Sequence, residues 1–152
     1  MADMIFSGVT FSGGYSIQIP PAPPTGTQKA IFGYGSNDSL GRVSMTNLVS
    51  NIGVVAGDTT GVGTARTYLA AAGYGGDKAI FGYGTTGTNT AITNLVSNTG
   101  IVATDTTGVG TAREQLAAAG YGTDKAIFGY GYSGGGQTAI TNLVSNTGVV
   151  AT

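Results

Sequence analysis

The chain repeats itself, and this repetition limits the folds open to it more than any other feature. The segment from Arg113 to Gly131, REQLAAAGYGTDKAIFGYG, recurs from Arg66 to Gly84 as RTYLAAAGYGGDKAIFGYG. Its second half, KAIFGYG, also occurs from Lys29 to Gly35. Copies that are nearly identical are expected to form the same structure and to meet their neighbours in the same way. The sequence therefore predicts a short head followed by one unit written nearly three times.

The spacing and the residue pattern of the units favour β-structure. Lys29, Lys78 and Lys125 open successive copies, 49 (78 − 29) and 47 (125 − 78) residues apart. A period of this length is typical of one β-propeller blade or of a larger solenoid unit. Gly, Asn, Asp and Thr punctuate each unit at positions that suit tight turns. We expect strands at Lys29–Tyr34, Ser44–Ser50, Gly53–Ala56, Leu69–Tyr74, Lys78–Tyr83, Ala91–Ser97, Gly100–Ala103, Leu116–Tyr121, Lys125–Tyr130, Ala139–Ser145 and Gly148–Ala151.

The Ala-rich stretch of each unit is compatible with two structures. Thr111 to Gly120, TAREQLAAAG, is also a good short helix with a glycine at its C-terminal cap. A helix of about two turns is marginal on its own, and the other copy has Thr67-Tyr68 in place of Glu-Gln. The comparison favours a strand and leaves the helix as the alternative.

Composition supports a packed β-protein that is shielded by assembly. Only 9% of the residues are charged, against about 25% in a typical globular chain. Hydrophobic residues make up 41% of the chain, so charge-driven disorder is not expected. There are 28 glycines, which suits short strands joined by tight turns. A chain with so few charges needs another protection from association, and burial in a larger assembly would provide it.

Several function classes lack the residues they require. The net charge is −1, with no block of Lys or Arg of the kind that binds nucleic acid. The chain has neither cysteine nor histidine, which removes thiolate sites and the commonest general base. The Gly-Tyr-Gly motifs lack the Lys and Ser or Thr of a phosphate-binding loop. We expect no enzyme activity, cofactor or metal, and a turn-forming role for the recurrent aspartates Asp58, Asp77, Asp105 and Asp124.

The N-terminal head is set apart by proline. Residues 20–27, PPAPPTGT, contain all four prolines and are expected to be a stiff spacer, with the boundary between residues 1–24 and the repeat domain 25–152. In the head, Tyr15, Ile17 and Ile19 alternate with polar residues as in a half-buried strand. The head either packs on its own repeats or anchors the chain in a neighbouring subunit. The anchoring candidates are Phe6, Phe11, Tyr15, Ile17 and Ile19.

Neither a signal peptide nor a membrane span is evident. The start has no basic region, and no apolar run approaches the roughly 20 residues of a membrane-spanning helix. Synthesis in a cytoplasm without a Sec-type signal is expected.

Recurrent tyrosines are the best candidates for a recognition surface. They lie at one repeated position, and a further tyrosine follows in the last unit: Tyr34, Tyr83, Tyr130 and Tyr132. A tyrosine combines a rigid apolar ring with a polar tip, which suits interfaces and sugar binding. The alternative is that the repeated tyrosines fill the gaps between units.

The order of these features resembles the kelch repeat of β-propellers over residues 29–152. In that family an arginine precedes the innermost strand, and glycines end the second strand. Arg66 and Arg113 match the arginine, and Gly82 and Gly129, with Gly33 in the first unit, stand at the glycine position. The family's tryptophan is missing. The resemblance implies four-stranded antiparallel blades in which the arginines bond backbone carbonyls between blades.

The units are also similar to repeats in proteins of tailed bacteriophages, which are often virion components. Eleven strands make about three blades, fewer than the four to eight of a closed propeller. We therefore expect a partial propeller completed by association with further copies, as a dimer or trimer. The implied function is that of a structural virion protein: a tail, fibre or capsid-decoration subunit. The alternative is a lectin-like propeller that binds cell-surface glycans.

Overall fold

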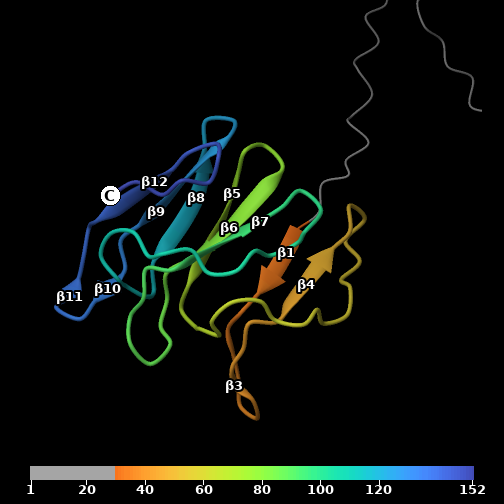
Figure 1. Ribbon diagram of the computed structural model, residues 1–152, viewed down its shortest axis with the longest axis horizontal. Helices are drawn as coiled ribbons and strands as arrows, with labels where there is room; N and C mark the ends of the chain where they lie inside the picture. Colours follow the sequence, from red (N-terminus) through yellow and green to blue (C-terminus); the bar gives the residue numbers. More distant parts are fainter. Residues whose placement is uncertain (1–29) are drawn as a thin grey trace, which may run out of the picture.

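Small antiparallel sheets in a row make up the structure, a computed structural model that describes residues 30–152 (Figure 1). Unit 1 (residues 30–58) has two main strands, and unit 2 (residues 66–105) and unit 3 (residues 113–152) have three each. Residues 59–65 and 106–112 are the links between units. Short two-residue pairs extend from units 1 and 3. The strands are β1 Ala30–Gly33, β2 Ser36–Asn37, β3 Gly41–Arg42, β4 Thr46–Val49, β5 Ala70–Tyr74, β6 Lys78–Gly82, β7 Thr93–Val96, β8 Ala117–Tyr121, β9 Lys125–Gly129, β10 Tyr132–Ser133, β11 Gly136–Gln137 and β12 Thr141–Val144. The described part of the chain contains no helix, which confirms the all-β class.

Units 2 and 3 have the same topology. In unit 2 the order is β5-β6-β7, and in unit 3 it is β8-β9-β12, with all neighbours antiparallel. The Ala-rich stretches are strands: Ala70 pairs with Gly82 and Tyr74 with Lys78, across a turn of three residues. The helical alternative for these stretches is therefore wrong. Most alanines and the glycine of these stretches are paired with β6 or β9, and this pairing stabilises an extended backbone.

The expected fourth strand of each unit is absent from the described sheets. The segment around Val102 makes a single β-bridge, with Val96, and Val55 and Val150 do the same in the other units. Side chains account for the difference. Asn94 donates to the carbonyl oxygen of Ala103, and the hydroxyl of Ser97 accepts from the Ile101 amide. These bonds hold the segment in a tight turn in which a longer ladder cannot form.

Unit 1 is a two-stranded sheet, because β1 pairs with β4 and has no described strand on its other edge. In unit 2 that edge is occupied by β5, and in unit 3 by β8. These two edge strands lie side by side where the sheets of units 2 and 3 meet (Figure 1). The described sheets do not close into a barrel or a propeller ring. The head, the proline spacer and the predicted boundary near Thr25 lie outside the described residues.

The hydrophobic core lies between the units. Along β6, alternate residues point to opposite faces, so Phe81 faces unit 1 while Ile80 faces unit 3. Phe81, Val96 and Val102 pack on unit 1 around Tyr34. The corresponding residues of unit 3, including Phe128 and Val144, pack on unit 2 around Tyr83. Each unit thus depends on its neighbours for burial of its apolar faces, as in other repeat proteins.

Candidate functional site

Most of the buried polar chemistry of the described chain lies at the two junctions between units. At the first junction, the ring of Tyr34 meets that of Phe81 edge-on, with centroids 5.1 Å apart. At the second, Tyr83 and Phe128 have the same separation of 5.1 Å. The interplanar angles, 61° and 64°, also agree. The repeated sequence therefore builds one junction geometry twice.

A glycine of the preceding unit makes room for each phenylalanine. A Cβ atom added to Gly82 would lie 2.7 Å from Cζ of Phe128, and one added to Gly33, which would also clash with Thr46 of its own unit, would lie 3.3 Å from Cζ of Phe81. Both distances are shorter than ordinary van der Waals contact. We call this pairing the phenylalanine knob and the glycine notch. It explains why the repeat carries glycine at the end of its KAIFG strand.

A buried arginine closes each junction. Arg66 is completely buried, and its Cζ lies 4.3 Å above the centre of the Tyr34 ring of unit 1. Its Nε donates to the Tyr83 carbonyl oxygen at 2.9 Å, and Nη2 donates to Oδ1 of Asn94 at 2.7 Å. Nη1 donates to the Thr64 carbonyl oxygen. The Arg66 side chain thus contacts three parts of the chain: the link that precedes unit 2, unit 2 itself and the tyrosine of unit 1.

Asn94 and Asp105 complete this network. Asn94 is fully buried and donates to Asp105 at 2.9 Å, while Asp105 also accepts from the amide and hydroxyl of Thr64. Burial raises the pKa of Asp105, but the bonds from Thr64 and Asn94, with the nearby charge of Arg66, outweigh it, so the net pKa is below the usual 3.8. Burial lowers the pKa of Arg66, which Tyr34 and Asp105 partly oppose. A carboxylate near a buried guanidinium compensates part of its desolvation.

The second junction reproduces most of this arrangement. Arg113 is buried, lies 4.1 Å from the centre of the Tyr83 ring, and donates to the Tyr130 carbonyl and to Asn142. Its Nη2 has no hydrogen-bond partner among the described residues. Among the described residues no carboxylate forms an ion pair with Arg113, whereas Asp105 lies 3.9 Å from Arg66.

The three repeated tyrosines share a left-handed backbone. Their φ angles are 63° at Tyr34, 64° at Tyr83 and 62° at Tyr130. This region is uncommon for bulky residues and persists where the surroundings impose it. At Tyr34 and Tyr83 the ring packs against the next unit, whereas the Tyr130 ring is exposed. At Tyr34 and Tyr83 the hydroxyl groups reach carbonyl oxygens of the following link, those of Val62 and Val109.

The prediction of a recognition surface made of the repeated tyrosines is wrong for two of them. Tyr34 and Tyr83 are buried and fill the gaps between units, so they cannot form an exposed binding surface. Tyr130 and Tyr132, in unit 3, are exposed. The anchoring candidates Phe6, Phe11, Tyr15, Ile17 and Ile19 lie outside the described residues.

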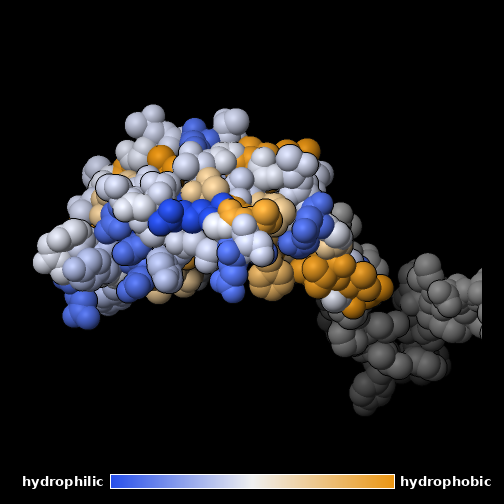
Figure 2. Space-filling view, turned by 90° about the horizontal axis from the view of Figure 1, so that it is seen from below, coloured by the Kyte–Doolittle hydropathy of each residue, from blue (hydrophilic) through white to orange (hydrophobic). Residues whose placement is uncertain are grey.

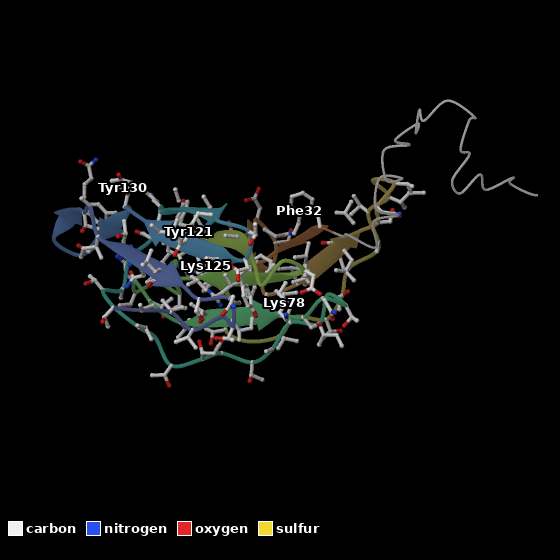
Figure 3. All side chains as sticks on the ribbon, turned by 90° about the horizontal axis from the view of Figure 1, so that it is seen from above. Phe32, Lys78, Tyr121, Lys125 and Tyr130 are labelled. Carbon is white, nitrogen blue, oxygen red and sulfur yellow. The ribbon has the colours of Figure 1, made fainter. Side chains whose placement is uncertain are left out.

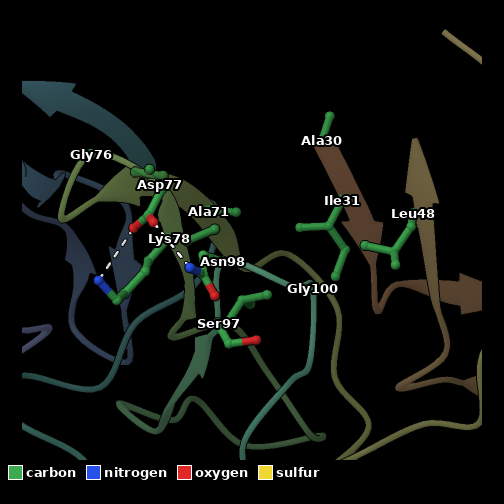
Figure 4. Close-up of a pocket in the computed structure, with 14 residues that line it drawn as sticks. Ala30, Ile31, Leu48, Ala71, Gly76, Asp77, Lys78, Ser97, Asn98 and Gly100 are labelled. Carbon is green, nitrogen blue, oxygen red and sulfur yellow. Dashed lines mark hydrogen bonds and ion pairs between the residues drawn. The ribbon is translucent and has the colours of Figure 1, made fainter. Parts of the chain in front are cut away.

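A cavity of about 490 Å³ lies between units 1 and 2, beside the edge of β1 that has no described partner strand (Figure 4). Its apolar lining includes Ile31 and Leu48. Its polar lining includes Asp77, which accepts hydrogen bonds from Lys78 and Asn98. The corresponding space between units 2 and 3 is narrowed by β8, which packs against β5.

The remaining aspartates act locally. Asp77 and Asp124 pair with the adjacent Lys78 and Lys125, and Asp58 accepts a bond from Asn47. The part of the chain that the structure describes contains no group of three acidic, histidine or cysteine residues placed to hold a metal. It also contains no helix that could cross a membrane.

Sequence reasoning did not single out the phenylalanine knobs or the junction asparagines. Both recur in every unit: Phe32, Phe81 and Phe128 in KAIFGYG, and Asn47, Asn94 and Asn142 in TNLVSN. An asparagine at a fixed position inside an apolar strand is a usable signal, because a buried amide needs several partners.

No protein-family model matches the chain, and no curated protein sequence matches it.

Proposed function

We propose that this protein is a structural subunit of a bacteriophage virion, a tail, fibre or capsid-decoration component, built as a partial kelch-like propeller that further copies extend. The observation that carries the proposal is the repeated junction. Both buried arginines and the two fully buried asparagines bond to backbone or to each other at the junctions. This buried polar chemistry serves packing between units. The likeness of the repeats to phage virion proteins supplies the setting.

Recovery of the chain with purified particles tests this proposal. A tagged full-length chain, produced during infection, should copurify with the particles through a density gradient and should withstand a salt wash. A chain of residues 25–152 should fold but stay in the unbound fraction, because the proposal assigns the anchor to the head. Absence of the full-length chain from the particles would refute a virion role. Equal incorporation of the two chains would refute only the anchor.

A second candidate is a module that binds host-surface glycans, and the cavity between units 1 and 2 favours it. Sugar sites combine apolar walls with a few polar groups, and this cavity places Asp77, Lys78 and Asn98 beside Ile31 and Leu48. Binding of the purified protein to a glycan array would support this function. Asp77→Ala should then remove the binding, while Asp124→Ala, the same turn position in unit 3, should not.

A further inference from the structure

In the part of the chain that the structure describes, the first and last units each leave one sheet face uncovered. Phe32 of unit 1 is 65% exposed, whereas its counterparts Phe81 and Phe128 are 3% and 0% exposed. Tyr130 of unit 3 is 64% exposed, whereas Tyr34 and Tyr83 are 9% and 0% exposed. We call the two surfaces the start face (Phe32, Val49 and Val55) and the end face (Gly129, Tyr130 and Leu143). Val55 and Leu143 are exposed as well.

The two faces belong to the first and last units of the row. Phe32 lies over β1, and Tyr130 lies toward the other end of the ribbon, in unit 3 (Figure 3). Hydrophobic residues gather over the end of the molecule that carries unit 1 (Figure 2). The exposed large hydrophobic side chains belong mainly to units 1 and 3, and contiguous apolar surface of this kind marks interaction sites.

The two internal junctions show what each face fits. At each internal junction, the surface of one unit that corresponds to the start face packs on the surface of the preceding unit that corresponds to the end face. The distance between the tyrosine and phenylalanine ring centres is 5.1 Å at both junctions. At the end face of unit 3 the notch is open. A Cβ atom added to Gly129 would meet only Thr141, at 3.5 Å, with no aromatic ring nearby. The knob that fits this notch is the exposed Phe32.

We infer that a second copy of this chain seats the Phe32 of its start face on the Gly129 notch and Tyr130 ring of the first copy. This inference rests on the proposed structural function and names its partner. The contact is head-to-tail, so each copy uses a different face and keeps one face free for another copy. Such an interface closes into a ring or continues as a filament, depending on the rotation between copies.

The joint between copies has fewer contacts than an internal junction. Inside the chain, the polypeptide link between units brings Arg66 over Tyr34 and lets the Tyr34 hydroxyl donate to the Val62 carbonyl. The described residues of unit 1 offer no arginine at the matching position. The joint consequently depends on the aromatic and aliphatic contacts, and its formation should depend on protein concentration in the micromolar range.

Sedimentation of the purified full chain at micromolar concentrations tests the inference with three interface variants. Phe32→Asp disables the start face, and Tyr130→Asp disables the end face, at a backbone position that aspartate tolerates. Gly129→Ala adds one methyl group to the notch, which its own unit accommodates. Each variant should raise the apparent dissociation constant at least tenfold. Ile101→Asp, an equally exposed change in the turn of unit 2, should leave association at the wild-type level.

A mixture of the two charged variants is the decisive arm. Phe32→Asp keeps an intact end face and Tyr130→Asp keeps an intact start face, so an equimolar mixture should form a dimer and nothing larger. A monomeric wild-type chain, or a mixture that fails to pair, would overturn the inference. Loss of association in only one of the two variants would indicate a symmetric interface and would also overturn it. Recovery from particles tests the virion role separately, so the two failures can be told apart.

Discussion

At the scale of single residues, the glycine at the end of each KAIFG strand decides how closely two units approach. We predict that Gly82→Ala destabilises the chain by about 1–3 kcal/mol, because the added methyl would overlap the ring of Phe128. Gly57→Ala is the matched control, since a Cβ atom there meets nothing within 4 Å. Urea denaturation of both variants gives the measurement. Equal stability of the two would mean that the junction yields without strain.

The carboxylate of Asp105 gives the first junction a dependence on pH. Its pKa is lowered in the folded chain, so its contribution is present above the usual value of 3.8 and is lost as the pH falls through the lower folded value. We predict that Asp105→Asn costs about 1–2 kcal/mol at pH 7 and that the cost shrinks toward pH 3. The exposed Asp58→Asn, which alters the same position in unit 1, should change stability little. A cost that does not vary with pH would contradict the assignment.

At the scale of elements, the strands should differ in protection. β6 is paired on both edges, and neighbouring units cover both of its faces, whereas β1 has one described partner and exposes Phe32. We predict that amide hydrogen exchange is slowest in β6 and β9 and at least tenfold faster in β1 and β4. Mass spectrometry of dilute protein gives the rates. Uniform exchange in all three units would show that the chain opens as one cooperative body.

The repeats made much of the fold predictable at this scale. The continuous apolar run Ala-Ile-Phe in KAIFG is typical of a strand buried on both faces, and its recurrence placed β1, β6 and β9 within a residue or two. The fourth strand was wrong because strand propensity in GVVA does not register the competing bonds from Asn94 and Ser97. The junction could not be read from spacing either. That Phe81 of one unit faces Tyr34 of another depends on how the sheets stack, which no local pattern specifies.

At the scale of the whole molecule, stability should depend on concentration. If copies associate through the start and end faces, the folded state is favoured by mass action as the protein is concentrated. We predict that the Tm of the wild-type chain rises by a few degrees over a hundredfold increase in concentration, while that of Phe32→Asp stays constant. Differential scanning calorimetry at several concentrations provides the data. A wild-type Tm that does not move would argue against assembly through these faces.

The sameness of the two junctions also bears on how such a gene can change. Deletion of residues 78–124, one period of 47 residues (124 − 78 + 1), would join Asp77 to Lys125 and recreate an intact KAIFGYG segment. The shortened product would keep Phe32 at one end and Tyr130 at the other, and Phe128 would meet Gly33 as Phe81 does now. Unequal recombination between copies can therefore lengthen or shorten the protein in whole periods while both ends stay compatible with the unaltered chain. Length and connectivity can evolve independently here, since one knob-and-notch geometry serves every boundary.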